Sequence, residues 1–281
     1  MAAFYVSDLD GTLLKNDSYL SDFSKARLQR LIEDGLYFSI ASARSVVSMH
    51  PLMGGLKLNL PVIEFNGAFI SDFETGRHEI VNAIDPSIAT EIFALLRQWS
   101  RSLFVSTFDG KADRVYYNDI TNDGESHFVE NRRRHSDPRL CAVPDLAKKL
   151  EEEVVCLTVI GKPEALAELE LRVHDRFSRQ LEIHMFENRY SPGWYWLTVH
   201  DSRATKNQAI EVVRQMHGLR DHELIVFGDH ANDIKMFQLA TQAVAVANAL
   251  PEVKRHATHV VGTNEEDSVV RFIEDHFGGR Q

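Results

Sequence analysis

The chain has 281 residues, of which 44% are hydrophobic and 26% are charged, and its formal net charge at pH 7 is -10. Its length exceeds the common domain size of roughly 100 to 150 residues, so we expect two modules. The acidic balance argues against partners such as nucleic acid or an anionic membrane, because both attract clustered Lys and Arg side chains.

The N-terminal segment alternates between predicted strands and helices. Residues 4–7 form a short apolar run that ends at Asp8 and Asp10, so we expect a buried strand that carries both carboxylates at its carboxyl end. A helix follows, with Ser24 as the expected N-cap and Gly35 at its C-terminal end. The further elements expected here are strands over 36–41 and 61–65 and a hairpin over 67–83.

Residues 85–189 have a separate pattern that predicts an inserted α/β module. Inserted into a parallel-sheet domain, it would lie over the carboxyl edge of the strands, where open α/β sheets bind ligands. We therefore expect it to act as a lid. Its predicted helices cover 87–100, 121–134, 145–152 and 163–178, and its predicted strands cover 103–107, 114–117, 154–160 and 181–186.

The C-terminal third returns to the alternation of the N-terminal segment. Together, residues 1–84 and 190–281 predict an α/β domain with one doubly wound, Rossmann-like parallel sheet. The elements expected in this third are helices over 205–216 and 232–240, strands over 224–227, 243–246 and 259–261, and a last helix from about 265.

Cellular location is indicated only indirectly. The first residues run directly into a polar turn, so a signal peptide or membrane span is not expected there. Cys141 and Cys156 lack the paired spacing of a zinc or redox site. A reducing cytoplasm fits best, and the sequence leaves the oligomeric state open.

Acidic side chains follow two of the predicted strands. Asp8 and Asp10 alone are a weak signal, but Asp229, Asn232 and Asp233 follow another apolar strand and bring the number of converging acids to four. Like charges at such short range are compensated most simply by a bound divalent cation. Because the ligands are hard oxygens without His or Cys, Mg²⁺ is favoured over zinc.

Two further segments predict contacts with an anion. Ser42 ends a strand, and its hydroxyl and the amide groups of the following helix start could hold phosphate oxygens. Lys206 lies in the first turn of a helix, where a cation opposes the helix dipole and a nearby anion would explain it. The alternative is an exposed Lys at a helix start.

Taken together, these segments resemble the haloacid dehalogenase superfamily of phosphohydrolases, in particular its Cof-type branch. The resemblance covers most of the chain and implies a Rossmann-like core with an α/β cap domain that selects the substrate. The segments around Ser42 and Lys206 match less closely. The motifs that carry the resemblance read Asp8-Leu9-Asp10-Gly11-Thr12-Leu13-Leu14, Phe65-Asn66-Gly67-Ala68 and Gly228-Asp229-x-x-Asn232-Asp233-x-x-Met236.

By position, the resemblance implies that Asp8 attacks phosphorus and forms an aspartyl-phosphate. Asp10 would be the acid that protonates the leaving alcohol and the base that activates water. Asp8 and Asp229 would bind Mg²⁺ together with the backbone carbonyl of Asp10, and Asp233 would lie in or just outside the coordination shell.

The resemblance also implies how phosphate is held. Ser42 and Lys206 would bind the transferring phosphoryl group, and Lys206 would also neutralise Asp8 before attack. Asn232 would orient Lys206 or a phosphate oxygen. The other residues assigned to phosphate or substrate binding are Ala43, Arg44, Asn66 and Gly67.

Two positions depart from the pattern of the branch. Ala43 replaces a Gly, which would strain the backbone by about 1 kcal/mol or more if the position required a positive φ. Asn207 stands where a Gly commonly follows the Lys. Both changes concern the geometry of the phosphate pocket and leave every charged group in place.

The function expected from these observations is a Mg²⁺-dependent phosphatase for small phosphorylated metabolites, with sugar phosphates as the first expectation. The segment between Asp8 and Ser42 is too short for a domain, and the position of the insertion after Ser42 is the one that accompanies such substrates in the family. Two alternatives stay open, a phosphomutase or phosphotransferase of the same superfamily and a non-catalytic module that binds phosphometabolites.

Overall fold

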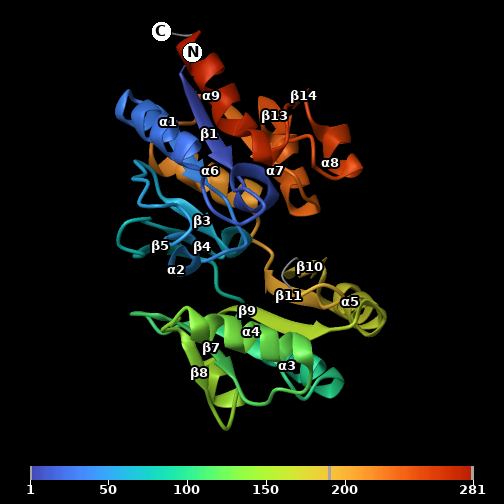
Figure 1. The fold of residues 1–281 in the computed structure, drawn as a ribbon. Helices are drawn as coiled ribbons and strands as arrows, with labels where there is room; N and C mark the ends of the chain where they lie inside the picture. The colour runs from blue at the N-terminus through green and yellow to red at the C-terminus, as the bar shows by residue number, and fades with distance from the viewer. Residues whose placement is uncertain (1, 189–190, 280–281) are drawn as a thin grey trace. The chain divides into compact units, whose positions relative to one another are not determined.

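The computed structural model describes residues 2–188 and 191–279. The chain divides into two compact units, a core unit formed by Met1–Ile80 with Ala204–Gln281 and an insertion formed by Val81–Arg203. In Figure 1 the first and last parts of the chain, in blue and in orange to red, interleave within the core unit.

A parallel sheet forms the centre of the core unit. In the part of the chain that the structure describes it has five strands, in the order β14-β13-β12-β1-β2. Every neighbouring pair is parallel, as the alternation of strands and helices predicted. Strand β1 is buried along its whole length, because its apolar residues lie between layers of helices. The strands are β1 (Ala3–Ser7), β2 (Tyr37–Ile40), β12 (Glu223–Gly228), β13 (Gln242–Ala245) and β14 (His259–Val260).

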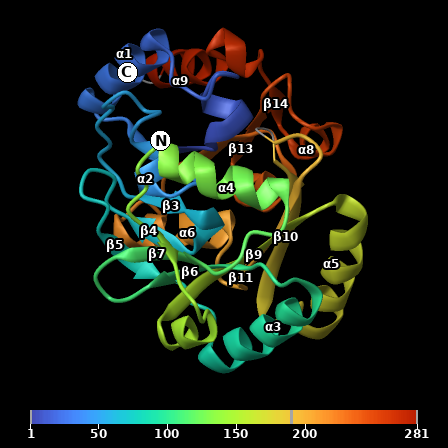
Figure 2. The same ribbon diagram turned by 60° about the horizontal axis from the view of Figure 1, so that its bottom comes forward.

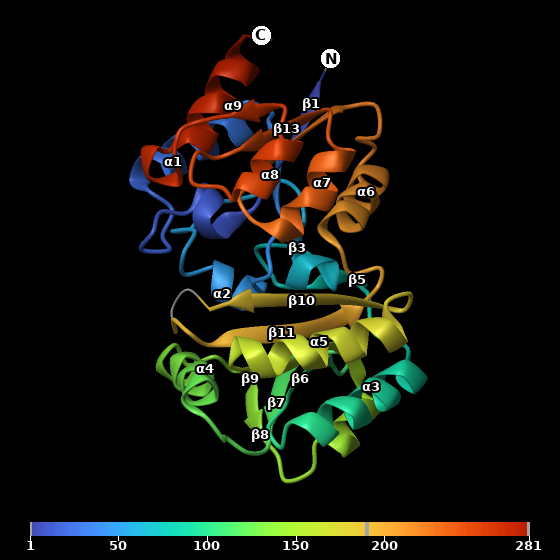
Figure 3. The same cartoon turned by 90° about the vertical axis from the view of Figure 1, so that its right-hand side faces the viewer.

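Helices cover both faces of this sheet (Figures 1 and 3). Helices α1 (Asp22–Glu33) and α9 (Ser268–Gly278) pack against each other on one face, and α6 (Lys206–Met216) and α7 (Ile234–Leu239) do so on the other. On the first face, Phe272 of α9 makes an edge-to-face contact with Phe227 of β12, with ring centroids 5.6 Å apart. The short helices α2 (Val46–Met49) and α8 (Pro251–His256) complete the unit.

Helix α1 begins earlier than the sequence predicted. Ser21 is its N-cap, and the Ser21 hydroxyl accepts the backbone N–H of Ser24 at 3.0 Å, so Ser24 lies inside the helix. The predicted end is correct, because Gly35 adopts a φ of +97°, a conformation that favours glycine after a helix.

A small antiparallel sheet adjoins the core sheet at β2. It contains β3 (Val62–Glu64), β4 (Phe69–Ser71) and β5 (His78–Val81). Ala41, directly after β2, forms a parallel bridge to Ile63 of β3. The last two strands form the hairpin expected over 67–83, and the bridge brings the β3–β4 turn to the carboxyl end of β2.

The insertion contains a sheet of its own, with six described strands in the order β10-β11-β9-β6-β7-β8. Helices α3 (Pro86–Trp99) and α5 (Pro163–Phe177) share one apolar cluster with the sheet, and α4 (Asp123–Arg134) packs in a second cluster. Figure 2 shows the ribbons of these three helices beside the strands of the insertion. A short 3-10 helix, Ala147–Glu151, stands where a longer helix over 145–152 was expected. The strands are β6 (Phe104–Phe108), β7 (Asp113–Tyr117), β8 (Leu140–Ala142), β9 (Glu153–Gly161), β10 (Leu181–Glu187) and β11 (Tyr195–Asp201).

The boundaries of the insertion differ from the expected 85–189. Residues 189 and 190 themselves lie outside the described residues, but the next strand, β11, pairs with β9 and with β10 and so belongs to the insertion. The insertion therefore ends at Arg203. Within the described ranges, no helix is long and apolar enough to cross a bilayer.

Candidate active site

The site is built at the carboxyl ends of two neighbouring strands. The N–H of Asp8, directly after β1, donates to the carbonyl of Phe227 in β12 at 3.0 Å. The chain then turns through Leu9–Leu13, where Gly11 adopts a φ of 79° that favours glycine. Asp229 follows β12 directly. Because β1 and β12 are parallel neighbours, the two carboxylates lie at the same edge of the sheet.

Three of the four acids expected to converge do so. Carboxylate oxygens of Asp8, Asp229 and Asp233 lie within 4.8 Å of one another, and all three residues are buried. The fourth acid, Asp10, turns its side chain to Arg44 instead. A group of carboxylates without His or Cys suits a hard divalent cation such as Mg²⁺, so this cluster fits the predicted metal site.

Lys206 is buried at the start of α6 and lies between two of these acids. Its ammonium group donates to Asp8 Oδ1 at 2.6 Å and to Asp233 Oδ1 at 2.7 Å. Burial alone would lower the pKa of Lys206, but the carboxylates of Asp233 and Asp8 outweigh it and raise the pKa above its usual range. Lys206 therefore stays protonated, and its partners explain why a cation is tolerated at a helix start.

For Asp8, burial outweighs the effect of its cationic partner on the pKa. Burial raises the pKa of Asp8, the charges of Asp233 and Asp229 raise it further, and Lys206 lowers it without reversing the direction. Three carboxylates meet the single ammonium group of Lys206 at this edge, so their formal negative charge exceeds its positive charge. A divalent cation would supply the missing positive charge.

Both carboxylate oxygens of Asp233 are used within the protein. Oδ1 accepts from Lys206, and Oδ2 accepts the backbone N–H groups of Asp229 at 2.9 Å and His230 at 3.0 Å. The packing is close, because a Cβ on Gly228 would lie 2.6 Å from Asp233 Cγ. This geometry suits a residue that holds the loop and Lys206 from just outside a metal coordination shell.

Thr12 contacts the site, although the sequence analysis assigned it no role. Its hydroxyl donates to Asp229 Oδ1 at 3.1 Å, and the residue is buried. The turn over Leu9–Leu13 brings Thr12 back towards the strand ends, and the only signal in the sequence was its place in the first motif. It orients the Asp229 carboxylate.

The loop after β2 reaches the same edge of the sheet. The N–H of Ser42 donates to the Ile63 carbonyl at 2.9 Å, and the Ser42 carbonyl accepts the N–H of Asn66 at the same distance. Ser42 is buried, and its hydroxyl accepts the N–H of Arg44 at 3.2 Å. Ala43 is not among the described non-glycine residues with a positive φ, so the replacement of Gly at this position introduces no backbone strain.

Arg44 forms a forked ion pair with Asp10. Its Nε lies 2.6 Å from Asp10 Oδ2, and its Nη2 lies 2.7 Å from Asp10 Oδ1. The sequence assigned Arg44 to substrate binding and Asp10 to proton transfer, without connecting the two. The structure adds a direct contact between them.

The β3–β4 turn supports the start of α6. Gly67 has a φ of +117°, and a Cβ there would lie 2.7 Å from the carbonyl oxygen of Thr205, the N-cap of α6. Asn66, with a φ of 58°, accepts a hydrogen bond from Asn232 at 3.0 Å. Asn232 was expected to orient Lys206 or a phosphate oxygen, but its described partner is Asn66.

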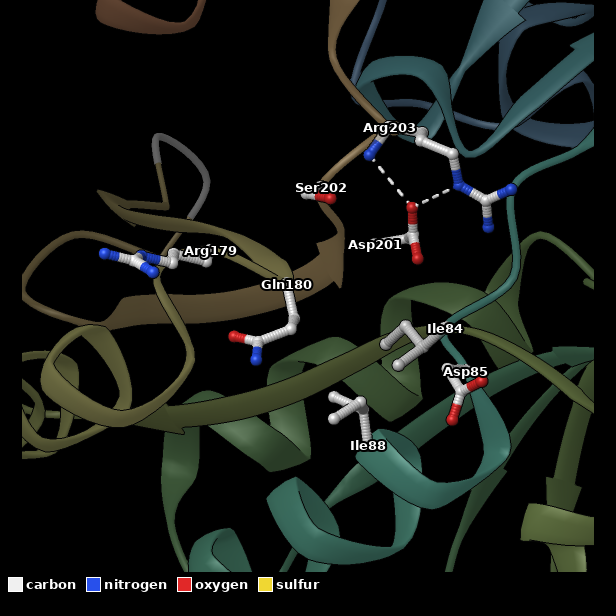
Figure 4. A pocket seen from close by; sticks show the side chains of 8 residues that line it. All are labelled: Ile84, Asp85, Ile88, Arg179, Gln180, Asp201, Ser202 and Arg203. Carbon is white, nitrogen blue, oxygen red and sulfur yellow. Dashed lines mark hydrogen bonds and ion pairs between the residues drawn. The ribbon is translucent and has the colours of Figure 1, made fainter.

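A separate pocket lies within the insertion, where the chain enters and leaves it (Figure 4). Arg203 donates to Asp201 Oδ1 at 2.6 Å and to the Ala83 carbonyl at 3.0 Å. These bonds tie the entering and leaving segments together. The lining residues are Ile84, Asp85, Ile88, Arg179, Gln180, Asp201, Ser202 and Arg203.

A parallel sheet with an acidic, lysine-bearing carboxyl edge belongs to the α/β enzymes that bind ligands at their strand ends. More narrowly, the family model described as haloacid dehalogenase-like hydrolase matches residues 5–273. The chain belongs to this family. The family resemblance and the hydrolase class expected from the sequence are thereby confirmed.

Several relatives span nearly the whole chain. The 5-amino-6-(5-phospho-D-ribitylamino)uracil phosphatase YitU of Bacillus subtilis (strain 168) is 27% identical over 274 residues, with 96% of each chain covered. The pyridoxal phosphate phosphatase YbhA of Escherichia coli (strain K12) is 26% identical over 274 residues, also with 96% of each covered. The crystal structure of TM0651 from Thermotoga maritima matches with a TM-score of 0.77 and 26% identity over 98% of this chain and 97% of that one, which confirms the α/β fold class.

Proposed function

We propose that this chain is a Mg²⁺-dependent phosphatase that hydrolyses small phosphorylated metabolites through an aspartyl-phosphate on Asp8. The observation that carries the proposal is the buried Lys206, which bonds to Asp8 and Asp233 beside the third carboxylate, Asp229. Such a site supplies a carboxylate nucleophile, a cation for the phosphoryl oxygens and oxygen ligands for a metal in one place.

In the first step, a carboxylate oxygen of Asp8 forms a bond to phosphorus as the bond between phosphorus and the leaving oxygen breaks. The Asp10 carboxyl gives its proton to that oxygen. In the second step, Asp10 takes a proton from water, the water oxygen attacks phosphorus, and phosphate leaves with Asp8 regenerated. The Ser42 hydroxyl and Lys206 hold the phosphoryl oxygens.

Asp8, Asp229 and the backbone carbonyl of Asp10 would hold Mg²⁺, which supplies positive charge to the phosphoryl oxygens and the carboxylates when it is bound. Asp233 and Thr12 act from outside the shell, through Lys206 and Asp229 respectively. Gly67 lies against Thr205 at the start of α6, and Asn232 donates to the neighbouring Asn66. We also propose a cytoplasmic location, because free cysteines fit a reducing compartment.

Sugar phosphates are the first candidate substrates, because the insertion lies at the position that accompanies them in the family. Phosphomonoesters of ring-bearing compounds are the second candidate. This alternative is favoured by two relatives, which are a 5-amino-6-(5-phospho-D-ribitylamino)uracil phosphatase and a pyridoxal phosphate phosphatase. A panel that contains both classes, compared by kcat/KM, separates them.

The proposal is tested by incubating the protein with p-nitrophenyl phosphate and Mg²⁺ and measuring inorganic phosphate. We expect release that stops on chelation of the metal and in Asp8→Asn, while circular dichroism shows that the variant stays folded. Mg²⁺ binding without turnover would instead support a binding module. Phosphate transfer to a sugar acceptor, without free phosphate, would support the phosphotransferase alternative.

A further inference from the structure

The forked contact between Arg44 and Asp10 is unlike the other contacts of the site, because it engages both oxygens of one carboxylate through one side chain. The two N···O distances are 2.6 and 2.7 Å. Paired, charge-assisted bonds of this kind fix direction as well as distance. A carboxylate held in this way cannot rotate about its last side-chain torsion, which is otherwise broad.

The backbone on both sides of Arg44 is anchored. Its own N–H donates to the Ser42 hydroxyl at 3.2 Å, and its carbonyl accepts the N–H of Phe65 at 3.2 Å. Two residues on, the N–H of Val46 at the start of α2 donates to the buried Glu64 carboxylate at 2.5 Å. The guanidinium therefore extends from an anchored loop to the Asp10 carboxylate.

Asp10 is the more exposed partner. Its side chain is 35% exposed and that of Arg44 is 22% exposed, whereas Asp8 and Lys206 are almost fully buried. Packing alone therefore restrains Asp10 less than it restrains Asp8. The fork from Arg44 adds a directional restraint on this more exposed carboxylate.

We propose that Arg44 is a positioning residue for Asp10, which aims the Asp10 carboxyl at the leaving-group oxygen. This inference rests on the proposed function, in which the proton of Asp10 goes to that oxygen as the phosphorus–oxygen bond breaks. Between turnovers the fork restores one orientation of Asp10. Arg44 thus acts on the step that needs proton transfer, through Asp10 and not through the phosphoryl group.

The inference separates two kinds of substrate. An aryl phosphate such as p-nitrophenyl phosphate has a leaving group that departs without a proton, whereas an alkyl phosphate needs one. Arg44→Gln should therefore lower kcat for an alkyl phosphate by about 10- to 100-fold more than for p-nitrophenyl phosphate, within the range that general acid catalysis contributes. KM should change little for either substrate.

Three further variants sharpen the test. Arg44→Lys keeps the charge without the fork and should recover only part of the lost kcat. In an Asp10→Ala background, Arg44→Gln should add nothing to the discrimination between the two substrates. Arg27→Gln removes a partly exposed ion pair with Glu274, between α1 and α9, and serves as the matched control that should behave as the wild type.

Equal loss of kcat on both substrates, or a rise in KM alone, would overturn the inference and make Arg44 a substrate-binding residue. Full recovery in Arg44→Lys would overturn it as well, because charge alone would then suffice. A wild type that hydrolyses neither substrate would reject the proposed function, and the inference with it. If Arg44→Gln does not fold, the same comparison is made with Arg44→Lys, whose side chain fills similar space.

Discussion

The ammonium group of Lys206 lies 2.6 Å from a carboxylate oxygen of Asp8, and the two side chains are 0% and 9% exposed. A charge buried to this extent is tolerated only when it is paired. The same ammonium also bonds to Asp233, so two buried acids share one cationic partner. The ion pair between Lys206 and Asp8 therefore affects both the stability of the core unit and the chemistry at the carboxyl ends of its strands.

The first prediction is that Lys206→Met destabilises the metal-free protein and abolishes phosphate release. Without the ammonium, the carboxylates of Asp8 and Asp233 are left buried and unpaired, which costs about 3 to 5 kcal/mol in comparable cases. Urea denaturation measures the loss in the free energy of unfolding. Added Mg²⁺ should recover part of it, because a bound cation replaces some of the missing charge.

The exposed Lys57→Met is the matched control, with an expected change within about 0.5 kcal/mol. An unchanged free energy of unfolding in Lys206→Met would mean that the neighbouring acids are neutral in the folded state, contrary to the ion pairs described here.

The second prediction concerns metal binding. Thr12→Val keeps the shape of the side chain but removes the hydroxyl that donates to Asp229 Oδ1 at 3.1 Å. Residues that orient a metal ligand typically contribute a factor of about 10 or more to affinity, so we expect Mg²⁺ to bind about 10-fold more weakly. Titration calorimetry with Mg²⁺ alone measures this without reference to catalysis.

Thr90→Val, at an exposed position of α3, provides the comparison for the same chemical change away from the site. Equal Mg²⁺ affinity in Thr12→Val and Thr90→Val would show that Asp229 needs no orientation by Thr12.

The sequence predicted those parts of the fold that depend on local pattern. The strand before Asp8 and the strand before Asp229 are both apolar runs that end at acids, and parallel pairing then brings the acids to one edge. The start of α1 was placed too late, because Ser21 and Ser24 are both good N-caps and only tertiary packing selects one.

Contacts that depend on side-chain direction could not be predicted. Nothing local connects Arg44 with Asp10 or Thr12 with Asp229, because each pair meets only after separate loops have folded onto the sheet. The end of the insertion was missed for a similar reason. Strand β11 follows the predicted boundary in sequence but pairs with β9 and β10, and such long-range pairing leaves no mark on hydrophobic periodicity.

The third prediction is that the free energy of unfolding depends on pH through His200, a residue of the insertion. Burial and the neighbouring His184 lower the pKa of His200 to about 3, from its usual value of 6.5. The folded state therefore resists a proton that the unfolded chain accepts. The contribution of neutral His200 to the free energy of unfolding is complete above pH 6.5. As the pH decreases from 6.5 to about 3, this contribution falls by about 1.4 kcal/mol for each pH unit.

This slope is isolated by comparing the wild type with His200→Gln in urea denaturation at several pH values. The difference in the free energy of unfolding between the two proteins should change over this range, whereas the exposed His256→Gln should retain the slope of the wild type. Parallel curves for His200→Gln and the wild type would mean that His200 accepts a proton in the folded protein.

The fourth prediction separates backbone strain from a steric clash at the turn that supports Lys206. Gly67 and Gly55 both have a positive φ, of +117° and +81°, so Ala is strained at either position. A Cβ at Gly55 meets nothing within 4 Å, but one at Gly67 would lie 2.7 Å from the Thr205 carbonyl. Strain of this kind amounts to about 1 to 3 kcal/mol.

Gly55→Ala should therefore lose about that much stability and keep its activity. Gly67→Ala should lose more stability and most of its kcat, because the start of α6 and Lys206 must move. Urea denaturation and kcat on p-nitrophenyl phosphate measure the two effects. Equal kcat in both variants would show that the position of Lys206 does not depend on the close approach of Gly67 to Thr205.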